Sequence, residues 1–381
     1  MKPVLLALAL ACGCMPPALA AANAPAGASA PTVEATATDA SNFLADARRV
    51  LAAAVQPAAQ WNGPRTGPPA QAGKHVAVVG EDLRNGGILG VAQGVREAAK
   101  VIGWGVRVFD CGGTVAGRRK ALADALASAP DGLMLIGPDA NAILTGLQPF
   151  AERGIPIVGW HVAPKAGSVP GTPVAINVST DSLEVARVAA LAAIVQSGGR
   201  AGIVIFTDTS LDLPKTKANA MAEVVRRCAG CTLLEVSDVP ISRSPELMPQ
   251  TTRELLSRYG KRWTHALAIN DIYFDYAAPV LTQAGLPNGA ISMLSAGDGS
   301  EAAFLRIRAG TFQTGTVAEP LQLHAWQLVD EMNRLFAKEP VTGHVFPVHL
   351  VTRQNIAADG GLFFDPANGY RDVYRRIWRR P

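Results

Sequence analysis

Short apolar runs alternate with longer amphipathic segments through most of the chain. In the first half the apolar runs fall at 75–80, 104–110, 131–137 and 155–160. The segments between them repeat apolar residues with the spacing of a helix face. Strands that alternate with helices of this length form a parallel sheet with right-handed crossovers. The pattern therefore predicts an α/β lobe that begins near residue 73.

A second series of the same kind follows. Its strands are expected at 201–206, 232–238, 265–270, 291–297 and 311–317, and its helices near 183–197, 214–227, 246–259, 272–284 and 300–308. A chain of 381 residues is long enough for two such lobes and an extension. We therefore expect an α/β protein with two lobes.

Three strands of the second series end in polar clusters. These are Asn270-Asp271, Asp298 and the run from Thr316 to Glu319. Ligands of parallel α/β sheets bind at the carboxyl ends of the strands, so these clusters are candidate ligand contacts. Each has a structural alternative: Asp and Asn are favoured helix caps, and Glu319 suits the first turn of a helix.

The order of these motifs resembles the type I periplasmic solute-binding proteins of the ribose/galactose-binding family, the substrate-binding subunits of sugar ABC transporters. ND at 270–271, GDGS at 297–300 and TVAEP at 316–320 lie at the marker positions of that family. VAINVSTD at 174–181 and VHLVTRQN at 348–355 resemble its lobe crossings. The resemblance covers about residues 73–356.

This resemblance implies two Rossmann-like lobes with parallel sheets, joined by a hinge of three strands. The first lobe is expected from 73–176 plus 319–344, and the second from 177–318 plus 345–381. The implied function is to bind a small hydroxylated solute, a sugar or polyol, by lobe closure and to deliver it to an ABC-type permease. The alternative is a receptor whose closed form is read by a membrane sensor. Which solute binds is left open.

Ligand contacts are carried over from the family position by position. His161 stands where the sugar receptors have Asp, Lys215 matches a binding Arg, and Glu319 replaces a Gln. The aromatic pair that stacks on the sugar is missing near Gly87 and Ile88, and Trp160, a core residue or a platform, is one substitute. The full implied ligand set is Asp82, Arg84, Asn85, Trp160, His161, Lys215, Asn270, Asp298 and Glu319.

The N-terminus has the features of an export signal. Lys2, an apolar run at 4–11 and a small-residue site at 18–20 predict a cleavable signal peptide over 1–20 and a periplasmic protein. Attachment of lipid to Cys12 or Cys14 is the less favoured alternative. Residues 21–72 are interpreted as an extension with one helix at 41–56 and a Pro/Gly-rich linker.

Three cysteines remain after the predicted cleavage. Cys228 and Cys231 lie at a predicted helix end, so we expect a small structural disulfide between them and a buried thiol at Cys111. A thioredoxin-type redox pair instead opens a helix after a strand. A metal site is disfavoured because no His or second Cys pair lies nearby.

Other functional classes lack their signals. A net charge of +4 is small, and the basic C-terminal run at 369–381 is interpreted as solvated surface rather than a nucleic-acid groove. The Gly-rich loop at 81–87 matches neither dinucleotide nor P-loop motifs, so no cofactor is expected. Without a catalytic motif, the acidic residues are read as sugar contacts and not as a glycosidase pair. We expect a monomer without enzymatic activity.

Overall fold

The computed structural model describes residues 33–57, 60–358 and 361–379. The predicted signal peptide over 1–20, Cys12 and Cys14, and the following residues up to 32 lie outside the described residues. Residues 40–381 form one compact unit, and this unit contains both sheets of the protein.

The first lobe is built on a parallel five-stranded sheet in the order β2-β1-β3-β4-β5. Buried apolar side chains dominate its central strands, as expected for a sheet that helices cover on both faces. Its strands are β1 (His75–Gly80), β2 (Gly105–Asp110), β3 (Gly132–Ile136), β4 (Ile157–Trp160) and β5 (Val174–Val178). Its helices are α2 (Gly86–Ile102), α3 (Val115–Ala127) and α4 (Leu144–Glu152).

The second lobe is built on a six-stranded sheet in the order β11-β10-β9-β8-β6-β7, in which β11 alone runs antiparallel to its neighbour. Its strands are β6 (Gly202–Thr207), β7 (Thr232–Asp238), β8 (His265–Ala268), β9 (Ser292–Ser295), β10 (Gln313–Ala318) and β11 (His349–Thr352). Its helices are α5 (Ser182–Gln196), α6 (Asp212–Arg226), α7 (Ser244–Tyr259), α8 (Ile272–Gln283) and α9 (Glu301–Ala309), with 3-10 turns η1 (Ile241–Arg243) and η2 (Gly260–Arg262).

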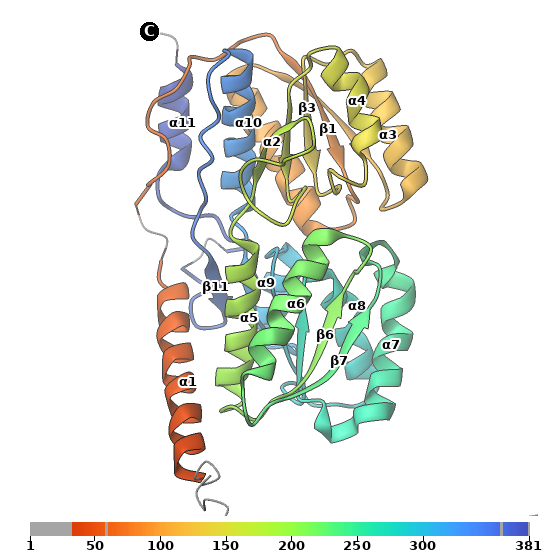
Figure 1. The fold of residues 1–381 in the computed structure, drawn as a ribbon, viewed down its shortest axis with the longest axis vertical. Coiled ribbons are helices and arrows are strands. Elements are labelled where there is room, and N and C mark those ends of the chain that lie inside the picture. The colour runs from red at the N-terminus through yellow and green to blue at the C-terminus, as the bar shows by residue number, and fades with distance from the viewer. Residues whose placement is uncertain (1–32, 58–59, 359–360, 380–381) are drawn as a thin grey trace, which may run out of the picture. The chain divides into compact units, whose positions relative to one another are not determined.

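The chain passes between the lobes several times. It leaves the first sheet after β5, enters the second lobe at α5, and returns after β10 in helix α10 (Leu321–Phe336), which packs against α2 of the first lobe. It then re-enters the second sheet as β11. Figure 1 shows α10 beside α2 in the first lobe and β11 in the second.

The C-terminal helix belongs to the first lobe, which differs from the expected domain boundary. Helix α11 (Tyr370–Trp378) packs on α10 and α2 of the first lobe, not on the second lobe to which 345–381 was assigned. Tyr370, Tyr374 and Trp378 recur at helical spacing and are buried around Trp326. The basic side chains occupy the other positions of the helix, so the segment is amphipathic and not solvated throughout.

The N-terminal extension contacts both lobes. Helix α1 (Val33–Ala54) places Ala47 and Ala54 in the core of the second lobe. Trp61, in the linker, is buried in the core of the first lobe, with its ring edge-on to Tyr374. This helix begins before the expected helix at 41–56 and ends at Ala54, two residues earlier than expected.

The three described cysteines have distinct states. Cys228 and Cys231 form a disulfide just after α6, with their Cα atoms 5.3 Å apart. Cys111 is a buried free thiol at the end of β2. Burial raises its pKa to about 12, so the thiol is protonated at neutral pH.

Candidate functional site

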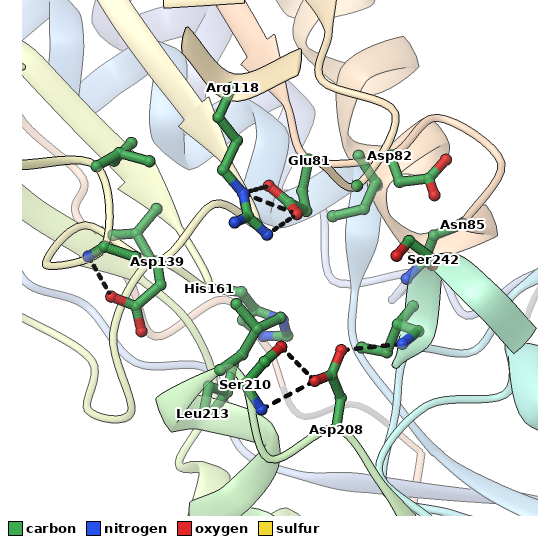
Figure 2. A pocket seen from close by; sticks show the side chains of 18 of the residues that line it. Glu81, Asp82, Asn85, Arg118, Asp139, His161, Asp208, Ser210, Leu213 and Ser242 are labelled. Atoms are coloured by element: carbon green, nitrogen blue, oxygen red, sulfur yellow. Dashed lines mark hydrogen bonds and ion pairs between the residues drawn. The ribbon is translucent and has the colours of Figure 1, made fainter. Parts of the chain in front are cut away.

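A cavity of about 980 Å³ lies between the two lobes. Residues from the carboxyl ends of β1, β3 and β4 line it from the first lobe, and residues that follow β6, β8 and β9 line it from the second. Its polar lining residues are Glu81, Asp82, Asn85, Arg118, Arg119, Asp139, Thr145, His161, Asp208, Ser210, Lys217, Ser242, Asn270 and Asp298. Figure 2 shows side chains of both lobes pointing into one space.

Asn270 and Asp298 form a bonded pair at the edge of the second sheet. The Asn270 side-chain amide donates to Oδ2 of Asp298 at 2.6 Å, while its Oδ1 accepts from the Ile272 amide at 3.0 Å. Asn270 therefore both accepts from the first amide of α8 and lines the cavity. The cap of α9 is Ser300, whose hydroxyl accepts from Ala303, so Asp298 is not a helix cap.

Burial raises the pKa of Asp298, and the charges of His161 and Lys217 oppose this rise. The buried Asp271 next to Asn270 points away from the cavity: it accepts from the Gly299 amide at 2.7 Å and from Gln313 at 2.7 Å. Asp271 thus holds the loop that carries Asp298. It does so from inside the protein, so its role is structural support of the site.

His161 links Asp298 to Glu319. Its Nδ1 lies 3.9 Å from the Asp298 carboxylate and its Nε2 lies 3.4 Å from the Glu319 carboxylate. The residue has a positive φ of 54°, a backbone conformation uncommon outside glycine. Its ring is buried and stacks on Trp160 at 3.8 Å.

Glu319 lies behind the cavity wall and is fully buried. Thr180 donates a hydrogen bond of 2.6 Å to it. Burial raises the pKa of Glu319, but the charge and hydrogen bond of the neighbouring His161, together with smaller contributions from His324 and Lys217, outweigh burial and bring the pKa below its usual range. Glu319 is therefore an ionised support for His161 rather than a residue of the lining.

Trp160 borders the cavity but is 0% exposed beneath His161. Its indole N–H donates to Nδ1 of His324 at 3.1 Å. Burial lowers the pKa of His324 to about 4, so this histidine is neutral and able to accept. Of the two interpretations of Trp160, the structure favours the core residue over the stacking platform.

The loop after β1 carries three predicted contacts with different positions. Asn85 lines the cavity and caps α2, because its side chain accepts from the Gly87 amide. Asp82 also lines the cavity and is paired with Arg84 at 2.7 Å. The Arg84 side chain is 54% exposed, does not line the cavity, and donates to the Ser242 carbonyl of the other lobe at 3.1 Å.

Lys215 is not brought to the site. Its side chain is 51% exposed and pairs with Asp212 on the outer face of α6. Lys217, two residues later, is buried, lines the cavity and donates to the Ala296 carbonyl at 2.8 Å. Two residues correspond to about 200° of rotation around a helix of 3.6 residues per turn, so Lys215 and Lys217 face opposite sides.

Six charged lining residues have no counterpart in the predicted set: Glu81, Arg118, Arg119, Asp139, Asp208 and Lys217. Glu81, Asp139 and Asp208 follow β1, β3 and β6, so the strand-end rule that selected Asn270 also points to them. Arg118 lies on α3, carries no such signal, and forms a two-pronged ion pair with Glu81, with one bond of 2.9 Å (Figure 2). Burial raises the pKa of Glu81 while Arg118 opposes the rise.

Two kinds of feature are absent from the described part of the chain. It holds no cluster of three or more His, Cys, Asp or Glu side chains arranged to bind a metal. No helix within the described ranges is long and apolar enough to cross a membrane.

Comparisons with known proteins agree with this architecture. Residues 76–340 match the family model described as periplasmic binding protein domain. No curated protein sequence matches the chain.

Many solved structures resemble the chain. A sugar ABC transporter subunit from Rhodobacter sphaeroides is 18% identical, with a TM-score of 0.64 over 74% of this chain and 99% of that one. An ABC transporter solute-binding protein from Agrobacterium vitis with bound allitol is 17% identical, with a TM-score of 0.64 over 75% and 97%. Another from Agrobacterium vitis, bound with alpha-D-tagatopyranose, is 13% identical, with a TM-score of 0.67 over 77% and 99%. At these identities the likeness shows the fold, two α/β lobes of the type I periplasmic binding protein arrangement.

Proposed function

Because the chain belongs to the periplasmic binding protein domain family, we propose that it binds a sugar or polyol between its lobes and delivers it to an ABC-type permease. Structural neighbours bind allitol and alpha-D-tagatopyranose, which are hydroxyl-rich solutes of this kind. The proposal places the protein in the periplasm, as a monomer without catalytic activity.

The observation that carries the proposal is the convergence of buried polar side chains from both lobes on one cavity. Asn85 and His161 face it from the first lobe, and Lys217, Asn270 and Asp298 from the second. A hydroxyl both donates and accepts, so it matches carboxylates, amides and an ammonium group alike. A buried polar group without a partner costs about 1–3 kcal/mol, which favours a solute that pairs with all of them.

Contacts between the lobes support a closing motion. Arg84 of the first lobe donates to Ser242 of the second, and Asp139 of the first accepts from the Asp212 amide of the second at 3.4 Å. A solute that contacts both lobes favours the conformation in which these bonds form. Binding thus shifts the population of open and closed forms, which a permease can distinguish.

The test is a thermal-shift screen of the exported protein against sugars and polyols, followed by calorimetry on the compounds that bind. A ligand that binds only the native state raises its melting temperature. Asp298→Ala is expected to weaken binding of the active compound by about tenfold or more, and Lys215→Ala to leave binding unchanged. A screen without a single stabilising sugar or polyol would overturn the proposal.

A further inference from the structure

The cavity extends beyond the polar residues at the strand ends, which we call the polar cleft. About 980 Å³ lies at the upper end of the range for small-molecule sites, and a single sugar ring with its polar contacts fills only a part of it. Beyond the polar side chains the cavity continues along helices α3 and α4 of the first lobe. We call this continuation the α3–α4 groove.

Helix α3 presents one continuous face to this groove. The lining residues of α3 are Val115, Arg118, Arg119, Leu122, Ala123 and Leu126. Their spacing of three and four residues is that of a single helix face, which extends for about 16 Å at about 1.5 Å per residue. The cavity therefore runs from the cleft end of α3 to nearly its last turn.

The chemical character of the lining changes along this path. Near the cleft, Arg118 pairs with Glu81, and Asp139 and Asp208 flank the pair (Figure 2). Farther along, the described lining residues are Leu122, Ala123, Leu126, Ala142, Ile143, Thr145, Gly146 and Pro149, among which Thr145 alone has a polar side chain. The cavity thus has a polar end and an apolar end.

The apolar end is shaped by small residues. A Cβ on Gly146 of α4 would lie 2.7 Å from Cδ1 of Leu122. Glycine at this position lets Leu122 approach α4 closely, and the lining residues Ala123 and Ala142 have small side chains. The second lobe adds Leu211 and Leu213 at the start of α6. Leu211 stands at a helix N-cap, where a polar residue is usual, and makes no side-chain cap bond.

We propose that the α3–α4 groove is a second subsite, which binds an apolar substituent attached to the hydroxylated part of the solute. This inference rests on the proposed function, because the polar end of the same cavity must hold the hydroxyl groups. An alkyl or aryl group fits the groove by its chemistry, since burying it removes apolar surface from water on both sides. The class of ligand is an alkyl or aryl glycoside, or an ether of a polyol.

The occupant is assigned to the solute because the groove and the cleft are one cavity, and because both lobes supply apolar walls. Val115, the first residue of α3, also lines the cavity, and its apolar side chain is 60% exposed. A docking partner protein, by contrast, has no need of a continuous path to the polar cleft.

The experiment uses matched pairs of probes on the full chain. Each sugar of the screen is offered free and as its phenyl or octyl derivative, with the substituent at either the anomeric carbon or the terminal hydroxyl. Calorimetry is expected to show at least one derivative that binds about tenfold or more tightly than its free sugar, which corresponds to about 1.4 kcal/mol. In Ala123→Trp, which fills the groove, the ratio of the two affinities falls to about one.

Ala127→Trp is the matched control, because Ala127 is exposed on the same helix but does not line the cavity. In this variant we expect the derivative to bind more tightly than its free sugar by the same factor as in the wild type. Free sugars that bind better than every derivative overturn the groove proposal and leave the proposed function intact. A gain that survives in Ala123→Trp also overturns the groove proposal. If neither free nor substituted compounds bind, both proposals fail.

Discussion

Gly87, at the start of α2 in the first lobe, lies directly against Asp298 of the second lobe. A Cβ on Gly87 would fall 2.1 Å from Oδ2 of Asp298 and 2.6 Å from its Cβ. Real Cβ atoms do not approach other atoms this closely, so a side chain at position 87 is incompatible with the observed contact between the lobes. An aromatic residue at this position would clash with Asp298 in the same way.

Replacing Gly87 by Ala is expected to hinder lobe closure. The added methyl group clashes with Asp298 only when the lobes meet, whereas alanine within a helix is more favourable than glycine by about 0.5–1 kcal/mol. We expect solute affinity to fall by about tenfold or more while the melting temperature of the free protein does not fall. Calorimetry and small-angle scattering check both effects.

Gln93→Ala, on the exposed side of the same helix, serves as the control for Gly87→Ala. If the Gly87→Ala protein binds its solute with wild-type affinity and closes to the same extent in small-angle scattering, the close approach of Gly87 to Asp298 does not govern lobe closure.

Arg84→Ala is expected to open the closed form faster. It removes the bond from Arg84 to the Ser242 carbonyl at 3.1 Å, which joins the lobes. Because this guanidinium is more than half exposed, water screens the interaction, and we expect about a two- to fivefold faster dissociation of solute. Stopped-flow measurement of solute dissociation tests this. Lys215→Ala, which removes another exposed cation, is the control and should leave the rate unchanged. An unchanged dissociation rate contradicts a role for Arg84 as a latch.

Asp298→Asn is expected to stabilise the free protein and weaken binding. Burial raises the pKa of Asp298, so between its unfolded pKa and this raised value the folded state holds more protons. Stability therefore falls as pH rises through that window, and the Asn variant does not show this fall. We expect the variant to melt higher than wild type at pH 7 and to lose this advantage at pH 3. Thermal unfolding across this pH range provides the measurement.

Burial of His265 is expected to lower the free energy of unfolding in mild acid. Burial lowers its pKa to about 4 from the usual 6.5, so below pH 6.5 the unfolded state takes up a proton that the folded state resists. Stability should fall by up to about 3 kcal/mol between pH 6.5 and pH 4 from this residue. His265→Asn should flatten that part of the pH profile in urea unfolding. A profile of unchanged slope would show that His265 is not the group responsible.

Trp61→Ala is expected to destabilise the first lobe. The Trp61 ring is 3% exposed and packs edge-on to Tyr374 and His344. Removing a buried tryptophan side chain costs about 3–5 kcal/mol. Urea unfolding should show this loss, whereas Gln60→Ala, at the exposed neighbouring position, should show little. A loss below 1 kcal/mol would mean that the linker is not held by its tryptophan.

The alternation of apolar runs and amphipathic segments located nine of the eleven described strands, whereas β5 and β11 were expected only from the resemblance to the family. A buried parallel strand must be apolar and its connecting helix must have one apolar face, so sequence periodicity alone reveals them. The same logic located Asn270 and Asp298 at the cavity. Applied to every strand, the rule that ligands contact residues at strand ends also points to Asp139 and Asp208, which follow β3 and β6.

For residues away from the strand ends, only the tertiary structure decided which side chains face the cavity. Lys215 and Lys217 differ by two positions on α6, and only the packing of that helix turns Lys217 inward. Arg84 neighbours two lining residues but extends to the other lobe. The aromatic face of helix α11 packs against Trp326 and Trp61, which are far from it in the sequence. Local periodicity therefore does not reveal its partners. Sequence periodicity records how each segment folds locally, whereas contacts between distant segments depend on how the elements pack.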